Sequence, residues 1–425
     1  MKKRVLVFPC GSEIALEINR ALKDSIHFKM VGVSSISDHG EYVFKTYIPN
    51  IPFVEDAAFI PALQKVCDDY KIDFIFPAHD SVVLKLAQHA HEFKAKIITS
   101  SLETNEICRS KEKTYKKFQG IIPTPKLFQK DNIEKYPVFL KPSVGQGSKG
   151  TCKVSNKHEL DFYLSKNSEL LILEYLPGRE YTIDCFTNRH GKLLFAMGRQ
   201  RIRISNGISV SSKTVNNPKF IELAEKINKV LSFQGVWFFQ VKENTDGEFV
   251  LMEIAPRIAG TMGLSLGLGV NFAQLSLFDM MGYDVEIIRN NYEIQIDRAL
   301  YASYKINLDF DTVYIDFDDV ISLQTGVNTD AVKLLYQFKN QKKEIILLTK
   351  HAGDIYQKLD DLCISKNLFN KIIHIADTDE KSNYITKNNA VFIDDSFAER
   401  QKVMKNKNIS VFGVDNLSAL IDWRV

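Results

Sequence analysis

Residues 139–150 read FLKPSVGQGSKG, and this stretch decides how the centre of the chain is interpreted. Lys141 ends a short apolar run that is typical of a strand, and a loop with three glycines follows it. Glycine lets backbone N–H groups approach phosphate oxygens without a Cβ clash, and a lysine at the strand end adds a positive charge. A flexible surface hairpin is the alternative, so the interpretation depends on the segments that follow.

A second segment, LEYLPGREYTID at residues 173–184, combines an apolar strand with a Pro-Gly break. This composition suits a hinge whose backbone groups at residues 174–176 hydrogen-bond an adenine edge. Glu180 follows the break, where a carboxylate can hold ribose hydroxyls.

Two oxygen-bearing side chains, Gln240 and Glu253, lie on adjacent strand candidates joined by the turn at residues 245–247. Oxygen ligands on neighbouring strands are what Mg²⁺ needs to bridge nucleotide phosphates. Arg257 follows shortly after Glu253.

Three arginines, Arg199, Arg201 and Arg203, alternate along one strand candidate, and alternate residues of a strand face the same side. Charges of this kind often protect a solvated edge strand. The guanidinium fork also pairs with carboxylates and phosphates, so we expect at least one of the three to serve a binding pocket.

In order and spacing, these segments resemble the ATP-grasp superfamily, in its carbamoyl-phosphate-synthetase-like and amino-acid-ligase-like branch, from residue 1 to residue 305. The resemblance implies ATP and Mg²⁺ as cofactors, with Mn²⁺ as an alternative metal. It assigns Mg²⁺ to Gln240 and Glu253, and catalysis to Arg257 and Arg201. It assigns nucleotide contacts to Lys111, Lys141, Gly145, Gly147, Ser148, Gly150, Glu174, Tyr175, Leu176 and Glu180. Ala255 departs from the family, which commonly has a metal-binding Asn there, and this indicates an altered metal geometry.

The arrangement of apolar runs predicts α/β and α+β domains. Strands alternate with helices over residues 1–103, which predicts a doubly wound parallel sheet preceding the ATP-grasp domain. Gly11 and Ser12 lack the full spacing of a dinucleotide site, so NAD is not expected. Residues 104–305 predict a mixed α+β domain that begins with a helix over residues 103–118. Residues 311–425 again predict a doubly wound α/β domain.

Carboxylates gather at predicted strand ends in the last domain. Asp316 and Asp318 follow one apolar strand, and Asp394 and Asp395 follow another. The ends of parallel strands meet at one edge of a sheet, where these carboxylates would repel each other unless a cation such as Mg²⁺ lay among them. Thr349 ends an intervening strand, and Lys381 lies between the two acidic segments.

This series resembles the haloacid-dehalogenase (HAD) superfamily from residue 311 to residue 423. The resemblance implies Asp316 as the nucleophile and Asp318 as the general acid and base. Thr349 and Lys381 would hold phosphoryl oxygens. It assigns the metal to Asp316, Asp318, Asp394 and Asp395. The short spacing leaves no room for an inserted cap domain, so we expect a capless, Rossmann-like phosphohydrolase.

The composition is that of an ordinary globular protein of 425 residues with a net charge of +3. We expect no nucleic-acid partner and no membrane partner, and the sequence leaves open whether the chain forms a homo-oligomer. The uncharged stretch at 258–278 is interrupted by glycines and polar residues, so we expect a loop and a buried helix there. The scattered cysteines show no metal-clip spacing, and a cytoplasmic location is expected.

Three functions fit these patterns. The first is an ATP-dependent ligase that joins a carboxylate to an amine through an acyl phosphate. In this first interpretation the HAD-like domain removes phosphate from a metabolite of the same biosynthetic pathway. The second is a carbamoyl-phosphate-synthase-like enzyme that releases a phosphorylated product. The third is a nucleotide-binding regulatory protein with a degenerate HAD domain, which the change at Ala255 would favour.

Overall fold

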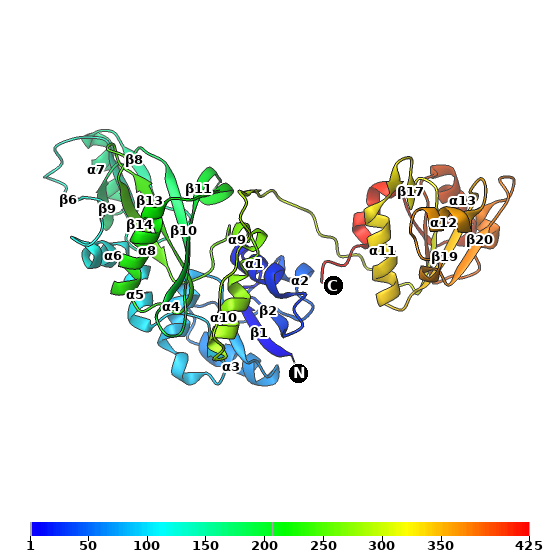
Figure 1. The fold of residues 1–425 in the computed structure, drawn as a ribbon, viewed down its shortest axis with the longest axis horizontal. Helices are drawn as coiled ribbons and strands as arrows, with labels where there is room; N and C mark the ends of the chain where they lie inside the picture. The colour runs from blue at the N-terminus through cyan, green and yellow to red at the C-terminus, as the bar shows by residue number, and fades with distance from the viewer. Residues whose placement is uncertain (1, 206, 425) are drawn as a thin grey trace. The chain divides into compact units, whose positions relative to one another are not determined.

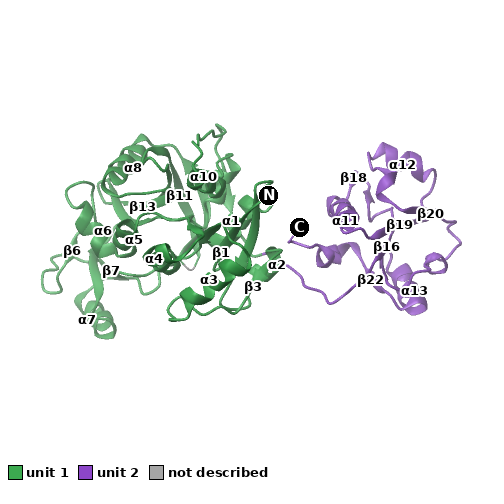
Figure 2. Ribbon diagram, turned by 90° about the horizontal axis from the view of Figure 1, so that it is seen from below, with its two compact units in different colours: residues 1–300 green, residues 301–425 purple. Residues whose placement is uncertain are grey.

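The computed structural model describes residues 2–205 and 207–424. The chain divides into two compact units, residues 1–300 (unit 1) and residues 301–425 (unit 2), which are coloured separately in Figure 2. The boundary predicted near residue 103 falls inside unit 1, in the first turn of the helix Leu102–Arg109. Each unit has its own hydrophobic clusters.

Unit 1 begins with a parallel five-stranded sheet in the order β3-β2-β1-β4-β5. Its strands are β1 (Lys3–Phe8), β2 (Phe28–Val33), β3 (Tyr47–Ile48), β4 (Phe74–Pro77) and β5 (Lys96–Ile97). Its helices are α1 (Glu13–Leu22), α2 (Gly40–Val43), α3 (Phe59–Asp69) and α4 (Asp80–Gln88). The chain turns to one side of β1 for β2 and β3 and to the other side for β4 and β5. The carboxyl ends of β1 and β4 therefore flank the switch point where open α/β sheets bind ligands.

Two helices follow where the sequence predicted one. They are α5 (Leu102–Arg109) and α6 (Lys111–Phe118), separated at Ser110. Ser110 is extended, and its hydroxyl accepts the backbone N–H of Lys113 as an N-cap. The prediction of one continuous helix over 103–118 is wrong because this serine caps a new helix.

A small antiparallel sheet carries the glycine-rich loop. Its order is β6-β9-β7-β8, and α7 (Lys157–Lys166) packs beside β8. The strands are β6 (Leu127–Phe128), β7 (Val138–Pro142), β8 (Cys152–Val154) and β9 (Leu170–Glu174). The glycine-rich loop connects β7 to β8.

A larger antiparallel sheet has the order β14-β13-β10-β11-β12-β15. Its strands are β10 (Glu180–Thr187), β11 (Leu193–Ser205), β12 (Ile208–Val215), β13 (Gly235–Glu243), β14 (Phe249–Ala255) and β15 (Gln295–Asp297). The remaining helices of unit 1 are α8 (Pro218–Val230), α9 (Gly263–Gly267) and α10 (Phe272–Met280). One face packs α8 around the buried Trp237 and Phe239. In Figure 1, β13 and β14 lie between the small sheet and the first α/β part.

Unit 2 is a parallel five-stranded sheet in the order β20-β19-β16-β21-β22. Its strands are β16 (Thr312–Ile315), β19 (Glu344–Thr349), β20 (Lys371–His374), β21 (Ala390–Ile393) and β22 (Ser410–Phe412). A hairpin of β17 (Ser322–Leu323) and β18 (Gly326–Val327) follows β16. The helices are α11 (Thr329–Asn340), α12 (Ile355–Asp361) and α13 (Phe397–Lys407).

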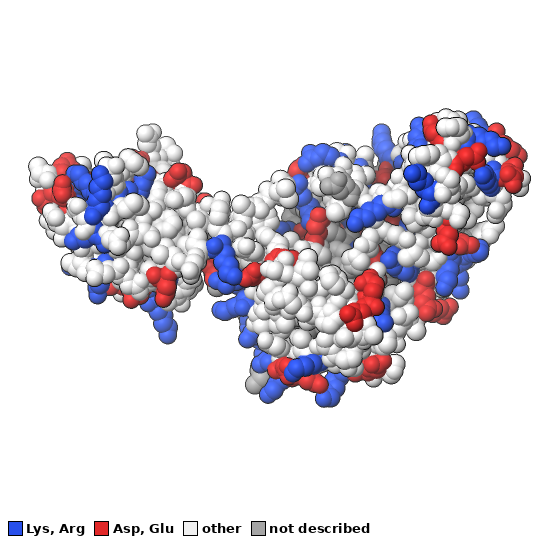
Figure 3. Space-filling model, turned by 180° about the vertical axis from the view of Figure 1, so that it is seen from behind, with Lys and Arg blue, Asp and Glu red and all other residues white. Residues whose placement is uncertain are grey.

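The uncharged stretch at 258–278 forms a loop with α9 and most of α10. Across residues 2–205 and 207–424, no helix is long and apolar enough to cross a membrane. Positive and negative side chains are interspersed over the face of unit 1 in Figure 3.

Candidate functional site

A cleft in unit 1 contains two adjoining cavities of about 380 and about 150 Å³. Both are lined by the glycine-rich loop and by Lys111, Gln240 and Glu253. The larger cavity also reaches the ends of β1 and β4, so the first sheet contributes its switch point to the site.

Two lysines enter the cleft from different elements. Lys141 is buried on β7, and its Nζ lies 3.2 Å from the carbonyl oxygen of Met252. Lys111 begins α6, and its Nζ lies 3.1 Å from the carbonyl oxygen of Gly145. Burial lowers the pKa of Lys141 to about 8, although the nearby Glu253 carboxylate opposes that shift. The break at Ser110 allows Lys111 to start a helix beside the loop.

The glycine-rich loop meets the β11–β12 hairpin at Gly207. A Cβ on Gly207 would lie 2.1 Å from the carbonyl oxygen of Gly147, and Gly207 has a φ of +76°. Only glycine permits this approach without displacing the loop. Gly147 and Ser148 line the smaller cavity together with Gly145.

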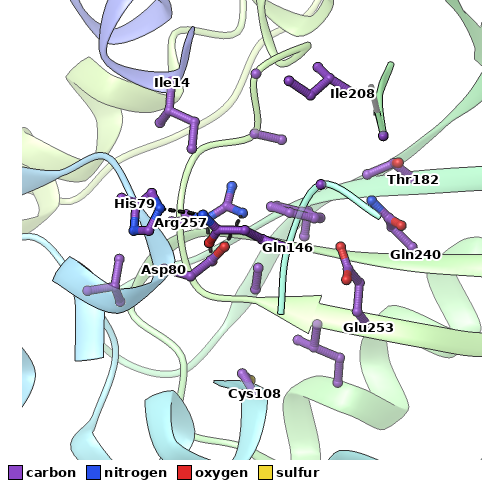
Figure 4. A pocket seen from close by; sticks show the side chains of 18 of the residues that line it. Ile14, His79, Asp80, Cys108, Gln146, Thr182, Ile208, Gln240, Glu253 and Arg257 are labelled. Carbon is purple, nitrogen blue, oxygen red and sulfur yellow. Dashed lines mark hydrogen bonds and ion pairs between the residues drawn. The ribbon is translucent and has the colours of Figure 1, made fainter. Parts of the chain in front are cut away.

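The two predicted metal ligands are direct cross-strand partners, because Gln240 on β13 pairs with Glu253 on β14. Figure 4 shows both side chains on the same side of the cleft. Within the described residues, the Glu253 carboxylate has no hydrogen bond or ion pair. This paired carboxylate and amide fit Mg²⁺, which takes oxygen ligands. Ala255 pairs with Phe238 and has no side-chain donor to add.

The three arginines of β11 have different environments. Arg199 is buried and pairs with Asp184 at 3.0 Å. Arg201 contacts Glu180, and its guanidinium also lies 3.4 Å from Gln240 Oε1. A register shift precedes Arg203, which is exposed and pairs with Asp297. Arg199 and Arg201 line the cleft, and Arg203 is not among the lining residues.

The predicted adenine hinge lies beside the cleft and not among its lining residues. The backbone N–H of Glu174 is bonded to the carbonyl of Lys126, and Leu176 is buried. The amino group of Lys242 lies over the Tyr175 ring. Lys242 itself lines the smaller cavity, whereas Tyr175 does not. Gly150 is also not among the residues that line the two cavities. It is the last residue of the glycine-rich loop and has a φ of +70°.

Arg257 is held by a residue that sequence reasoning missed. Its Nε and Nη2 atoms donate to the two carboxylate oxygens of Asp80 at 2.5 and 2.8 Å. Burial alone would raise the pKa of Asp80. The Arg257 guanidinium has the larger, opposite effect and lowers that pKa to about 2. The available signal was the position of Asp80 just beyond a central parallel strand.

His79 and Arg109 were also missed. His79 Nδ1 accepts the backbone N–H of Ser81, and burial lowers the pKa of His79. His79 Nε2 contacts the side-chain amide nitrogen of Gln146 in the glycine-rich loop. Arg109 donates to Ser81 Oγ at 3.1 Å. These contacts join the loop side of the cleft to the first sheet.

Unit 2 brings three of the predicted carboxylates together. Among the described residues, Asp316, Asp394 and Asp395 form one group whose oxygens lie within 4.8 Å of one another. Lys381 Nζ lies 2.8 Å from Asp316 and 2.6 Å from Asp394. Burial raises the pKa of Asp316, and burial with the Asp316 charge raises that of Asp394 to about 6. Asp316 Oδ1 is buried without a hydrogen-bond partner, which fits an oxygen that receives a cation.

Asp318 lies outside that carboxylate group. Its two oxygens are each 3.0 Å from Nδ1 of His351, a residue that sequence reasoning missed. Thr349 is fully buried at the end of β19, and its hydroxyl accepts the backbone N–H of His351. Asp316 and Asp394 directly follow β16 and β21, and Thr349 ends the neighbouring strand β19, as the sequence predicted.

Residues 166–299 match a family model described as "ATP-grasp in the biosynthetic pathway with Ter operon". The carbamoyl phosphate synthase large chain of Clostridium botulinum is 24% identical over 193 residues, covering 40% of this chain and 18% of that protein. The D-alanine–D-alanine ligase of Petrotoga mobilis is 25% identical over 162 residues, covering 33% of this chain and 54% of that ligase. The chain thus spans well under two thirds of each of these two proteins.

Solved structures share the fold at lower sequence identity. The biotin carboxylase domain of the Hydrogenobacter thermophilus 2-oxoglutarate carboxylase, in complex with MgADP, ADP and bicarbonate, aligns with a TM-score of 0.60 at 16% identity. That alignment covers 69% of this chain and 74% of the domain. ATP-grasp enzymes use ATP and Mg²⁺, and the donor set around Lys141 and Glu253 fits both. This chain carries an ATP-grasp fold, and residues 166–299 match the ATP-grasp family.

Proposed function

We propose that unit 1 is an ATP-dependent ligase that joins a carboxylate to an amine. The carboxylate attacks the γ-phosphorus of ATP, giving an acyl phosphate and ADP. The amine then attacks the acyl carbon, and phosphate leaves as the amide forms. The observation that carries this proposal is the convergence of Lys111, Lys141, Gln240, Glu253 and Arg257 on one cleft.

The residues of the cleft divide the work by position. Lys141 and Lys111 neutralise phosphate charge beside the glycine-rich loop, whose backbone N–H groups can approach the same oxygens. Gln240 and Glu253 would hold Mg²⁺, which would neutralise charge on the phosphates. Arg257 presents a cation to the transferred phosphoryl group, where charge develops during the reaction.

The larger cavity offers room for the carboxylate and the amine, because it extends from Glu253 to the switch point of the first sheet. The D-alanine–D-alanine ligase among the relatives supports an amide-forming reaction. A coupled assay of ADP release against panels of carboxylates and amines tests the proposal. Amine-dependent turnover that Glu253→Gln abolishes is expected. Release of a stable phosphorylated product without any amine would favour carbamoyl-phosphate-type chemistry instead.

We propose that unit 2 is a capless HAD-like phosphohydrolase for a phosphorylated metabolite. The observation that favours it is Lys381 placed between Asp316 and Asp394 at the ends of neighbouring parallel strands. Asp316 attacks phosphorus and the leaving group departs with a proton from Asp318. Water then hydrolyses the aspartyl phosphate. Asp316, Asp394 and Asp395 would hold Mg²⁺, which would offset the charge of the phosphoryl group.

Hydrolysis of p-nitrophenyl phosphate with and without Mg²⁺ tests this second proposal. Asp316→Asn should abolish turnover, while Asp361→Asn, an exposed site on α12, should leave it unchanged. Equal activity of the wild type and Asp316→Asn would contradict the proposal and favour a degenerate binding domain.

A further inference from the structure

The Asp80–Arg257 ion pair joins two parts of unit 1 that are distant in sequence. Arg257 follows β14 of the large sheet, and Asp80 begins α4 beyond the first sheet. The pair is side-on, with Nε donating to Oδ1 and Nη2 donating to Oδ2. The side chains of Arg257 and Asp80 are only 13% and 19% exposed, so solvent screens this pair less than a surface pair. Figure 4 shows Asp80 facing Arg257 within the cleft.

The pairing leaves a defined part of the guanidinium unused. A guanidinium has five N–H donors. Asp80 takes one from Nε and one from Nη2, and the carbonyl oxygen of Ile258 takes one from Nη1 at 3.0 Å. One N–H on Nη1 and one on Nη2 remain. The remaining N–H of Nη2 lies on the edge opposite Nε, where the guanidinium can still donate to a phosphoryl oxygen.

A second contact places the guanidinium over an aromatic ring. Its central carbon lies 5.2 Å from the centre of the Phe238 ring, which belongs to β13 next to the metal-ligand candidate Gln240. The carboxylate of Asp80 thus sets the rotation of the fork, and the aromatic ring supports its face. Arginine has several rotatable bonds, and a fork held in advance loses less entropy when it binds an anion.

We propose that Asp80 is a positioning residue that holds Arg257 with its free edge toward the transferred phosphoryl group. The inference rests on the ligase function proposed for unit 1 and deepens it, because the first sheet then contributes to the phosphoryl-transfer step. Both carboxylate oxygens of Asp80 are occupied by the Arg257 guanidinium. Its effect passes through Arg257.

Two other roles for Asp80 make different predictions. If the pair only stabilised the fold, removing Asp80 would change nucleotide binding and phosphoryl recognition together. If Asp80 masked Arg257, removing it would strengthen the binding of a phosphoryl mimic. A positioning role weakens the mimic alone, and only while Arg257 is present.

The test measures binding of Mg·ADP, and of Mg·ADP with orthovanadate as the phosphoryl mimic, to the full chain by titration calorimetry. Asp80→Asn should weaken mimic binding at least tenfold and leave Mg·ADP affinity within twofold of wild type. Arg257→Gln should have a similar effect, and the double variant should be no weaker than Arg257→Gln alone. Asp73→Asn, which breaks a 2.8 Å ion pair with Lys3 away from the cleft, is the matched control and should change neither affinity.

Additive losses in the double variant, or tighter mimic binding by Asp80→Asn, would overturn the inference. If Asp80→Asn does not fold, Asp80→Ser carries the same test, because serine also suits the start of a helix. Failure of the wild type to bind Mg·ADP at all would instead contradict the ligase proposal. The two failures are therefore distinguishable.

Discussion

Single residues in the cleft hold charge at a cost in stability. Lys141 is buried on β7 beside one backbone carbonyl, with the Glu253 carboxylate as a nearby anion. Its pKa of about 8 in the folded chain lies below the ordinary value of 10.5, so the native state disfavours the charged form. Below pH 8 the folded protein carries a buried cation that phosphate would neutralise. A buried cation of this kind lowers the stability of the free protein, and binding of an anion that neutralises it stabilises the complex.

Lys141→Met should therefore raise the free energy of unfolding of unit 1 at pH 7 by about 3 kcal/mol, while it abolishes Mg·ADP binding. The unfolded chain binds a proton between pH 8 and 10.5 that the folded chain does not, so wild-type stability rises with pH in that window. The advantage of Lys141→Met should shrink accordingly above pH 8. Urea unfolding followed by Trp237 fluorescence in a Trp423→Phe background measures this, and an advantage that is constant with pH would contradict it.

Asp394 predicts the opposite pH dependence in unit 2. Its folded pKa of about 6 lies above the ordinary 3.8, so the native state binds a proton that the unfolded chain releases between these values. In EDTA, unit 2 should gain about 1–2 kcal/mol of stability as pH falls from 7.5 to 5. At pH 7.5, adding Mg²⁺ should raise the stability of unit 2 by a similar amount. Unfolding followed by Trp423 fluorescence checks it, and Asp394→Asn should reduce the pH effect.

The sequence could predict those site residues that are identified by the residues next to them in the chain. Lys141 and Gly147 are identified by one loop, and Asp316 by the strand that precedes it. Asp80 could not be found in this way, because its partner Arg257 lies 177 residues away. Its role depends on a tertiary contact between two sheets, and no local pattern encodes that contact.

At the scale of elements, the glycine-rich loop and the β11–β12 hairpin shape the cleft by close backbone approach. Gly207→Ala should displace the loop from the hairpin and weaken Mg·ADP binding at least tenfold, because the new Cβ would meet Gly147. Gly191→Ala is the matched control. It has the same φ of +76°, but open space surrounds the site of its Cβ. Both variants should lose about 1 kcal/mol of stability from backbone strain. Equal nucleotide affinities, measured by titration calorimetry, would contradict the expected role of Gly207.

Element types were predictable where hydrophobic periodicity was long. The strand candidate that carries Arg199, Arg201 and Arg203 is β11 (Leu193–Ser205), in which apolar residues precede the alternating arginines. The edge strands β20 and β22 have four and three residues, too few for a period to be recognised. The break at Ser110 was missed because a capping serine in a helical pattern is also a tolerated interior residue.

At the scale of the whole molecule, the two units have separate hydrophobic clusters. A chain cut at residue 300 should therefore leave a unit 1 fragment that binds Mg·ADP within twofold of the full chain. A fragment of residues 301–425 should hydrolyse p-nitrophenyl phosphate at the full-chain rate. Loss of both activities on separation would contradict independent units. Calorimetry and a colorimetric assay on purified fragments measure the two outcomes.

The alternation of strands and helices in residues 1–103 and 311–425 predicted both parallel sheets, because buried parallel strands are continuous apolar runs. What the sequence could not predict is that the first sheet would share a cleft with the β13–β14 hairpin. That arrangement depends on packing across several elements, including the pair of Arg298 with Glu13 at 2.8 Å.

The side-on pair of Asp80 with Arg257 also bears on how such proteins can be recombined. A chimera with a crossover between these two positions would take the aspartate from one parent and the arginine from the other. If the parents differ in the distance between the two sheets, the Arg257 guanidinium would change its orientation. The hybrid would then fold but have low activity. Asp80 and Arg257 must then come from the same parent. Module exchange is therefore constrained for crossovers that fall between residues 80 and 257.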